Sequence, residues 1–271
     1  MASDLFKASG FGSGLRRRAA VGIGVLIGCT GLSSRAMAGE AEAMTLLKSM
    51  TRYMAAQQAI SFRYDTDLEI ITNDKQRLNL ASSGTVSLAR PGSIRATRSN
   101  GFINTESVFD GKTFTLLGKG RNVYMQVPIN GSIETLVDEL KDKYRRPLPA
   151  ADLLLPQAYE ELTDGVIDVK DLGSGVIGGV ECDHLAFRKK DVDFQIWIAQ
   201  GDRPFPCRYQ ITSKLISGSP QYTVQVSDWQ TGAAAVGQDF SFVPPDGARK
   251  ITFDDLKKMK DMGELPSHYQ L

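Results

Sequence analysis

Apolar and polar side chains alternate with a period of two along most of the chain, and this alternation restricts its fold more than any other feature. In residues 62–70 every odd position is charged, while the even positions are Phe, Tyr, Thr, Leu and Ile. Successive side chains of a β-strand point to opposite faces of a sheet, so the pattern predicts a strand with one apolar face. Comparable stretches recur at 78–88, 114–116, 123–127, 166–172, 180–188, 194–200, 208–215, 222–229 and 240–242. Turn pairs such as Asn100-Gly101 and Asp110-Gly111 lie between the early stretches, which predicts antiparallel hairpins.

Two stretches have helical spacing instead. Residues 40–58 and residues 133–143, the latter after the helix-capping Ser132, repeat their apolar side chains every three or four positions. A short apolar segment, 152–155, follows the second stretch. A two-sheet sandwich would also have one-sided strands. About eleven strands preceded by one helix and interrupted by a pair of helical segments favour a mainly β fold with α-helices, in which a single curved antiparallel half-barrel holds helices on its concave side.

The domain organisation follows from the same patterns. No repeat, low-complexity tract or linker divides residues 39–251, so we expect one half-barrel domain there. Residues 252–271 are expected to form a C-terminal helix or tail. Residues 1–38 have a different composition and predict a separate segment.

The first 38 residues predict export. The basic residues Arg16–Arg18 precede an uncharged run of 14 residues, Ala19–Leu32, and the small residues Ala36-Met37-Ala38 follow. This is the order of a bacterial secretory signal peptide. A membrane-spanning helix needs about 20 apolar residues, so we expect a cleaved signal and a periplasmic protein without an integral membrane span.

Two cleavage sites compete within this signal. Leu26-Ile27-Gly28-Cys29 resembles the lipobox of bacterial lipoproteins, and Ala36-Met37-Ala38 resembles an ordinary signal-peptidase site. The apolar run continues past Cys29 and then meets a normal polar cleavage region, which favours cleavage after Ala38. The alternative is lipidation at Cys29, which would anchor the protein to a membrane.

Cys182 and Cys207 are the only cysteines beyond the signal. An oxidising compartment favours a disulfide between them. In a meander, however, the strands 180–188 and 207–215 would flank a third strand and lie about 9 to 10 Å apart, beyond the Cα reach of a disulfide. Cys207 follows Pro204-Phe205-Pro206, where pairing of the strand need not have begun. A bridge and two buried thiols are both open.

Patterns for catalysis and metal binding are sparse. The two histidines are His184 and His268, and the chain has neither a C-x-x-C nor an H-E-x-x-H motif. We expect His184 to be a structural hydrogen-bonding residue, and we expect no enzymatic activity, cofactor or metal. The net charge is +1, of which residues 1–38 contribute +4, so the mildly acidic remainder is a poor partner for nucleic acids.

The second half of the chain resembles an uncharacterised family of predicted periplasmic proteins. The resemblance is carried by Cys182-Asp183-His184, Gln195-Ile196-Trp197, Pro204-Phe205-Pro206-Cys207, Ser227-Asp228-Trp229 and Pro244-Pro245. The family is similar in fold to the lipoprotein-localisation factors LolA and LolB. That likeness implies an unclosed half-barrel with helices across its open side and an apolar cavity between them. Relatives on this fold carry lipoprotein acyl chains, bind lipids or sense envelope stress.

Two functions are compatible with these observations. The leading hypothesis is a non-enzymatic periplasmic carrier or sensor that holds an acyl chain, a lipid or a lipoprotein in an apolar cavity. Its expected lining is Phe62, Tyr64, Leu68, Phe114, Leu116, Met125 and Ile196 from the strands, with Leu136 and Leu140 from the helix. A dry protein core would use the same residues. The alternative is an envelope interaction or structural protein without a small ligand.

Overall fold

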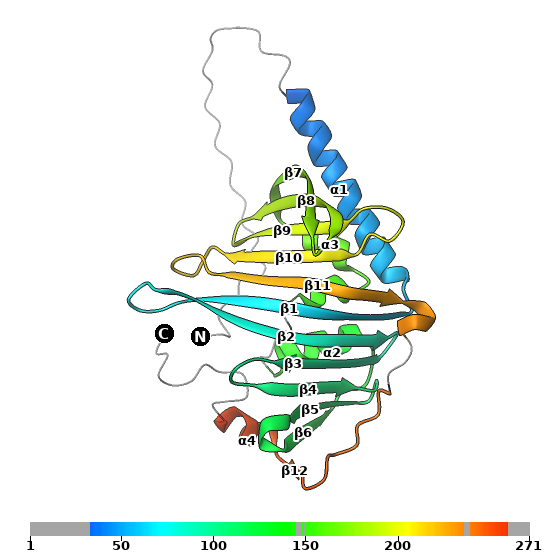
Figure 1. Cartoon of the computed structure of the whole chain (residues 1–271), viewed down its shortest axis with the longest axis vertical. Coiled ribbons are helices and arrows are strands. Elements are labelled where there is room, and N and C mark those ends of the chain that lie inside the picture. The colour runs from blue at the N-terminus through cyan, green and yellow to red at the C-terminus, as the bar shows by residue number, and fades with distance from the viewer. Residues whose placement is uncertain (1–32, 145–147, 149, 236–238, 260–271) are drawn as a thin grey trace, which may run out of the picture.

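The computed structural model describes residues 33–144, 148, 150–235 and 239–259, and it is built on one curved sheet of twelve strands (Figure 1). The strands are β1 (Ala59–Ile71), β2 (Arg77–Ala89), β3 (Ser93–Ser99), β4 (Asn104–Phe109), β5 (Thr113–Gly118), β6 (Val123–Pro128), β7 (Val166–Ile177), β8 (Val180–Lys189), β9 (Val192–Ala199), β10 (Pro206–Ser213), β11 (Gln221–Thr231) and β12 (Arg249–Lys250). Their order is β12-β6-β5-β4-β3-β2-β1-β11-β10-β9-β8-β7, so the sheet does not close. The predicted half-barrel is confirmed.

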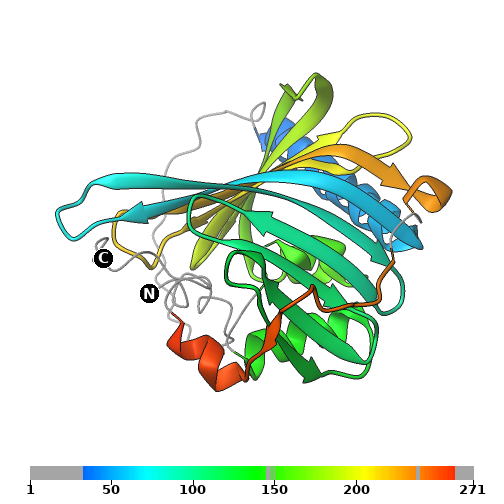
Figure 2. The ribbon, with the colours of Figure 1, turned by 60° about the horizontal axis from the view of Figure 1, so that its bottom comes forward.

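The helical segments lie mainly on the concave side of this sheet (Figure 2). They are α1 (Ser33–Ala56), α2 (Ile133–Asp142), α3 (Ala158–Thr163) and α4 (Phe253–Lys258), with short 3-10 turns η1 (Lys119–Arg121), η2 (Ala151–Leu154) and η3 (Gly232–Ala235). Ser132 caps α2 as predicted, because its side chain accepts a hydrogen bond from the backbone N–H of Thr135 at 3.4 Å. α3 was not predicted from the sequence, because its six residues are too few to show a helical repeat.

The expected cleavage after Ala38 falls inside α1, and among the residues whose burial is described the first core residue of α1 is Ala43. A chain beginning at Gly39 would therefore keep the described core contacts of α1. The alternative lipidation site, Cys29, lies outside the described residues.

Two apolar clusters join the helices to the concave face. The first contains Ala43, Leu47, Met50 and Met54 of α1, Leu153 and Leu155, and strand residues such as Leu185, Ile196 and Val224. The second contains Leu136 and Leu140 of α2 and Leu256 of α4 with Phe109, Phe114 and Met125. Ile94 of β3 is partly buried against both clusters. The helices are thus held at two separate places on one sheet.

Arg90, in the turn between β2 and β3, links the helical cover to the sheet. Its guanidinium donates hydrogen bonds to the carbonyl oxygens of Gln57 at 3.1 Å and of Leu154 at 2.7 Å. It also lies 3.8 Å from the carboxylate of Glu134 in α2. Only 9% of the Arg90 side chain is exposed, and burial lowers its pKa while Glu134 opposes that effect. One cation therefore contacts the end of α1, the turn η2 and the start of α2.

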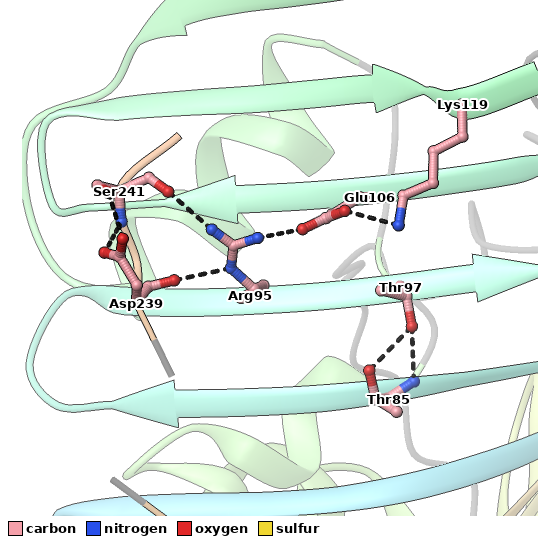
Figure 3. Close-up of polar contacts among 7 residues, drawn as sticks. All are labelled: Thr85, Arg95, Thr97, Glu106, Lys119, Asp239 and Ser241. Carbon is pink, nitrogen blue, oxygen red and sulfur yellow. Dashed lines mark hydrogen bonds and ion pairs between the residues drawn. The ribbon is translucent and has the colours of Figure 1, made fainter. Parts of the chain in front are cut away.

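The chain after β11 crosses the convex face and returns to the sheet edge. Arg95 of β3 donates to the main-chain oxygens of Asp239 at 2.8 Å and Ser241 at 2.7 Å, and it pairs with Glu106 (Figure 3). Lys119 also pairs with Glu106 at 2.7 Å. Burial raises the pKa of Glu106, but Lys119 and Arg95 outweigh it and the pKa is lowered. This network holds the returning segment against β3 and β4.

The returning segment corrects one expectation about the strands. Residues 240–242 form no strand, and the main-chain oxygens of Asp239 and Ser241 bind the side chain of Arg95 instead of a strand backbone. The twelfth strand is Arg249–Lys250, which pairs in parallel with β6 and covers its open edge. The capping box of Thr252 and Asp255 then starts α4 over the second cluster.

We expect Arg90→Ala to lower the free energy of unfolding by about 3 kcal/mol, because it leaves buried carbonyl groups and Glu134 without their cationic donor. Urea unfolding of the mature protein measures this change. Arg63→Ala is the matched control, since Arg63 is 69% exposed and pairs with the equally exposed Asp228; it should change stability by less than about 1 kcal/mol. Equal effects of the two substitutions would contradict the role of Arg90.

Candidate functional site

The nine residues predicted to line a cavity all lie on the concave side, but they divide between the two clusters. Phe62, Tyr64, Leu68 and Ile196 belong to the first cluster or pack against it. Phe114, Leu116, Met125, Leu136 and Leu140 belong to the second cluster or pack against it. The structure does not bring them together as one continuous lining.

Burial separates these nine residues further. Five are almost completely buried, namely Phe114, Met125, Leu136, Leu140 and Ile196. The other four, Phe62, Tyr64, Leu68 and Leu116, keep part of their surface exposed. The partly exposed residues are the better candidates for contact with a ligand, because the buried ones already have protein neighbours.

A cross-strand row that was not predicted from the sequence joins two of the partly exposed residues, Phe62 and Leu116. Strand pairing places Phe62 of β1 opposite Val86 of β2, and Val86 opposite Ala96 of β3. The row continues through Ser107 of β4 to Leu116 of β5. Alternation predicted that Phe62 and Leu116 point inward, but only the strand register shows that they belong to one row.

Tyr64 lies in the next row, across the backbone of Gly84. Its hydroxyl donates to the main-chain oxygen of Thr97 at 2.8 Å. A Cβ atom at position 84 would lie 2.7 Å from the Tyr64 hydroxyl and 2.0 Å from the Thr97 oxygen, so only glycine fits beneath the ring. Burial raises the pKa of Tyr64, which keeps the hydroxyl protonated as a donor.

Trp229 connects the first strand to the helical cover. Its ring stacks between Phe62, at a centroid distance of 5.5 Å, and Phe205, at 5.1 Å. Its indole N–H donates to the hydroxyl of Tyr53 in α1 at 3.3 Å. This stack makes one end of the concave face rigid and holds Phe62 in place.

Asp152 brings an acidic group into the first cluster. Burial raises its pKa to about 6, and the nearby charge of Glu161 acts in the same direction. Tyr209, on the facing strand β10, is 4% exposed, and its pKa is raised by burial and then by the charge of Asp152. The turn η2 therefore carries a carboxyl group that titrates near neutral pH between the helices and the sheet.

Cys182 and Cys207 are both buried thiols, on the two strands that flank β9. A register shift between Pro206 and Arg208 lies beside Cys207, and both thiols belong to one small buried cluster with Ile177 and Ala199. Burial raises the pKa of both thiols. The two cysteines thus share a cluster although β9 lies between their strands, and the bridge stays a prediction.

His184 makes ordinary structural contacts. Its Nε2 is 2.9 Å from the side-chain oxygen of Gln195, and its ring stacks on Trp197 at a centroid distance of 4.0 Å. Within the described ranges, His, Cys, Asp and Glu residues form no group of three or more that could hold a metal ion. The described helices also include none that is long and apolar enough to cross a membrane.

Two pockets open on the convex face. One of about 270 Å³ is lined by Ser61, Arg63 and Ser87 among others, and one of about 260 Å³ lies beside Glu106 and Ser241. Arg95 lines both pockets, and its guanidinium is already bound by Glu106 and two main-chain oxygens. These pockets are spaces beside the returning segment and differ from the apolar cavity expected on the concave face.

Comparison with known protein families shows to which family the chain belongs. The family model described as "Predicted periplasmic protein (DUF2092)" matches residues 43–254. The chain belongs to this family. The resemblance inferred from the sequence is confirmed, and so is the periplasmic location of this DUF2092 protein. A search of curated proteins found no match.

Several solved structures are similar to this DUF2092 protein. Lipoprotein LppX of Mycobacterium tuberculosis is 13% identical, with 74% of this chain and 100% of that chain covered and a TM-score of 0.38. LprF of Mycobacterium bovis is 14% identical, with coverages of 77% and 98% and a TM-score of 0.42. A LolA superfamily protein of Nitrosomonas europaea is 12% identical, with coverages of 70% and 93% and a TM-score of 0.25. Such low identities leave function to be inferred from this chain's own side chains.

Asp152 predicts a pH dependence of stability. Its pKa is about 6 in the folded protein and near 3.8 when unfolded, so between these values the folded state binds more protons. Its contribution to the free energy of unfolding should therefore fall by about 2 to 3 kcal/mol as the pH rises from 4 to 6, and stay constant above about 7. Urea unfolding of the wild type and Asp152→Asn from pH 4 to 7.5 isolates this contribution. Stability curves that stay parallel would show that Asp152 is not the titrating group.

We also propose that Cys182 and Cys207 are joined in the oxidising periplasm, since both thiols lie in one small buried cluster. A thiol-oxidising protein disulfide would accept the two electrons and the two protons and become a dithiol. Protein purified from periplasm, denatured without reductant and treated with a thiol reagent should then remain unlabelled until it is reduced. Labelling of both cysteines before reduction would exclude the bridge.

Proposed function

We propose that this periplasmic protein is a non-enzymatic carrier or sensor that binds an acyl chain, as part of a lipid or lipoprotein, on the concave face of its sheet. The observation that supports this most strongly is the row Phe62, Val86, Ala96, Ser107 and Leu116. All five are on the face that points toward the helices, and all five keep part of their surface exposed.

The arrangement of the helices supports the same proposal. α1, η2, α3 and the start of α2 cover the first cluster, and α2 and α4 cover the second. The β1–β2 hairpin extends beyond the helices that underlie the rest of the sheet (Figure 2). A sheet whose apolar face is wider than its cover can bury a flexible chain, and each Å² of apolar surface removed from water would contribute about 25 cal/mol before ordering costs.

The opposite edge of the sheet supports the alternative function, an envelope interaction protein. β7 is an edge strand, and its side chains Ile167 and Val176 are 68% and 66% exposed. Exposed apolar residues on an edge strand can pair with a partner protein. This edge is far from the concave row in the sheet order, so the two functions can be tested separately.

We expect a fluorescent fatty-acyl probe to bind the mature wild-type protein, and Leu116→Glu to weaken binding at least tenfold, because the substitution introduces a charge on the concave row. Leu215→Glu is the matched control: Leu215 is 67% exposed, and its substitution should leave the affinity unchanged. Leu140→Glu is less informative, since Leu140 is 3% exposed within the second cluster and its substitution would disturb folding.

Far-UV circular dichroism establishes that both variants are folded, and native mass spectrometry of the purified wild type shows whether lipid is retained. Folded wild-type protein that binds no acyl probe and retains no lipid would refute the carrier hypothesis. A pull-down of partner proteins that bind the β7 edge would then test the interaction hypothesis.

A further inference from the structure

Arg98 of β3 lies on the concave face beside the row proposed to bind an acyl chain. Strand pairing places it opposite Gly84 on one side and Thr105 on the other, two positions along β3 from Ala96. Because side chains alternate along a strand, Arg98 points to the same face as Ala96. The side chain is partly buried. A cation thus borders the partly exposed apolar row.

The guanidinium of Arg98 has only a weak protein partner. Its Nε and one terminal nitrogen both contact the Ser82 hydroxyl oxygen at 3.3 Å, and the side-chain amide of Asn100 contacts the same oxygen at 3.4 Å. A hydroxyl oxygen has two lone pairs, so it cannot satisfy three donors. Donors of Arg98 and Asn100 therefore converge on a place that lacks a strong acceptor.

Two other half-buried or buried arginines near this site have a carboxylate beside them. Arg90 faces Glu134, and Arg95 pairs with Glu106. Within the part of the chain that the structure describes, no carboxylate forms an ion pair with Arg98. A partly buried cation without an anion is costly unless a ligand supplies the charge.

Hydroxyl groups surround this cation. Thr66 and Ser82 are each 4% exposed, and the Thr66 hydroxyl contacts the Ser82 main-chain oxygen at 3.4 Å. Tyr64 and Tyr222 are close enough for the charge of Arg98 to act on both rings. Burial nevertheless raises the pKa of both tyrosines, so their hydroxyls stay protonated. The hydroxyls of Tyr64 and Thr66 already donate to main-chain oxygens, so the donors that remain for an oxyanion are the charged guanidinium of Arg98 and the amide of Asn100.

We propose that Arg98, with Asn100, binds the anionic headgroup of an amphiphile whose chain lies on the Phe62–Leu116 row. This inference rests on the proposed acyl-binding function and specifies its ligand class: a single-chain or multi-chain lipid with a carboxylate or phosphate group. The headgroup would accept the donors that Ser82 cannot satisfy. The apolar chain would contact the partly exposed side chains of the row.

The test compares ligands that differ only in the headgroup. Isothermal titration of the mature protein with dodecanoate and with dodecanol, each below its aggregation concentration, should give an affinity at least tenfold higher for dodecanoate. Arg98→Gln should abolish this preference while leaving dodecanol binding unchanged. Arg63→Gln removes a positive charge from the opposite face and should preserve the preference.

The outcomes separate the two proposals. Binding of both ligands with equal affinity, unchanged by Arg98→Gln, would overturn the headgroup site and leave the acyl-binding function intact. Binding of neither ligand by folded protein would refute the acyl-binding function itself. Dodecyl phosphate should also show the Arg98-dependent preference. Inorganic phosphate alone should neither bind at millimolar concentration nor compete; if it did both, the site would be one for a free anion.

Discussion

The contacts of Arg90 are the interaction on which the arrangement of the domain depends. A curved sheet with one apolar face needs a cover, and here three helical segments meet on that face at one polar point. Arg90 binds carbonyl oxygens at the end of α1 and in η2, and it faces Glu134 at the start of α2. Because the guanidinium is planar and has five donors, it fixes all three segments relative to the β2–β3 turn. The partly exposed row on the concave face lies beside this fixed cover.

Three arginines in β3 or in the turn before it have different roles. Arg90 fastens the cover, and Arg95 fastens the returning C-terminal segment to the convex face. Arg98 has donors left over and no carboxylate partner among the described residues. A side chain that performs no complete structural task, at the margin of an apolar row, is the reason to assign the ligand a negative charge.

Much of the fold could be predicted from the sequence because its signal is local. Alternation predicted nine of the strands but not β3 and β4, helical spacing predicted α1 and α2, and Ser132 marked the start of α2. Residues 240–242 were assigned wrongly because a Phe-Ser-Phe alternation is the same whether the neighbouring backbone binds a strand or an arginine side chain. β12 was missed because two charged residues, Arg249 and Lys250, have no strand pattern.

The candidate site was less predictable because it depends on strand register. Alternation identified Phe62, Tyr64, Leu68 and Leu116 as inward-facing, but it could not distinguish them from Met125 or Leu140, which the helices bury. Arg98 is a charged residue at an inward-facing position of β3. A ligand role could be inferred only from its surroundings, because Ser82 contacts it, Tyr64 lies in the next strands, and no carboxylate of the described residues pairs with it.

The central claim is that an acyl chain lies on the concave row, and methyl NMR of the mature protein during titration with dodecanoate tests it most directly. The account predicts that the methyl signals of Val86, Ala96 and Leu116 shift together and saturate at one equivalent of ligand. Methyl groups of Val176 and Leu215, which are exposed elsewhere, should not shift. Shifts confined to Ile167 and Val176 on β7, or no saturable shifts at all, would contradict it.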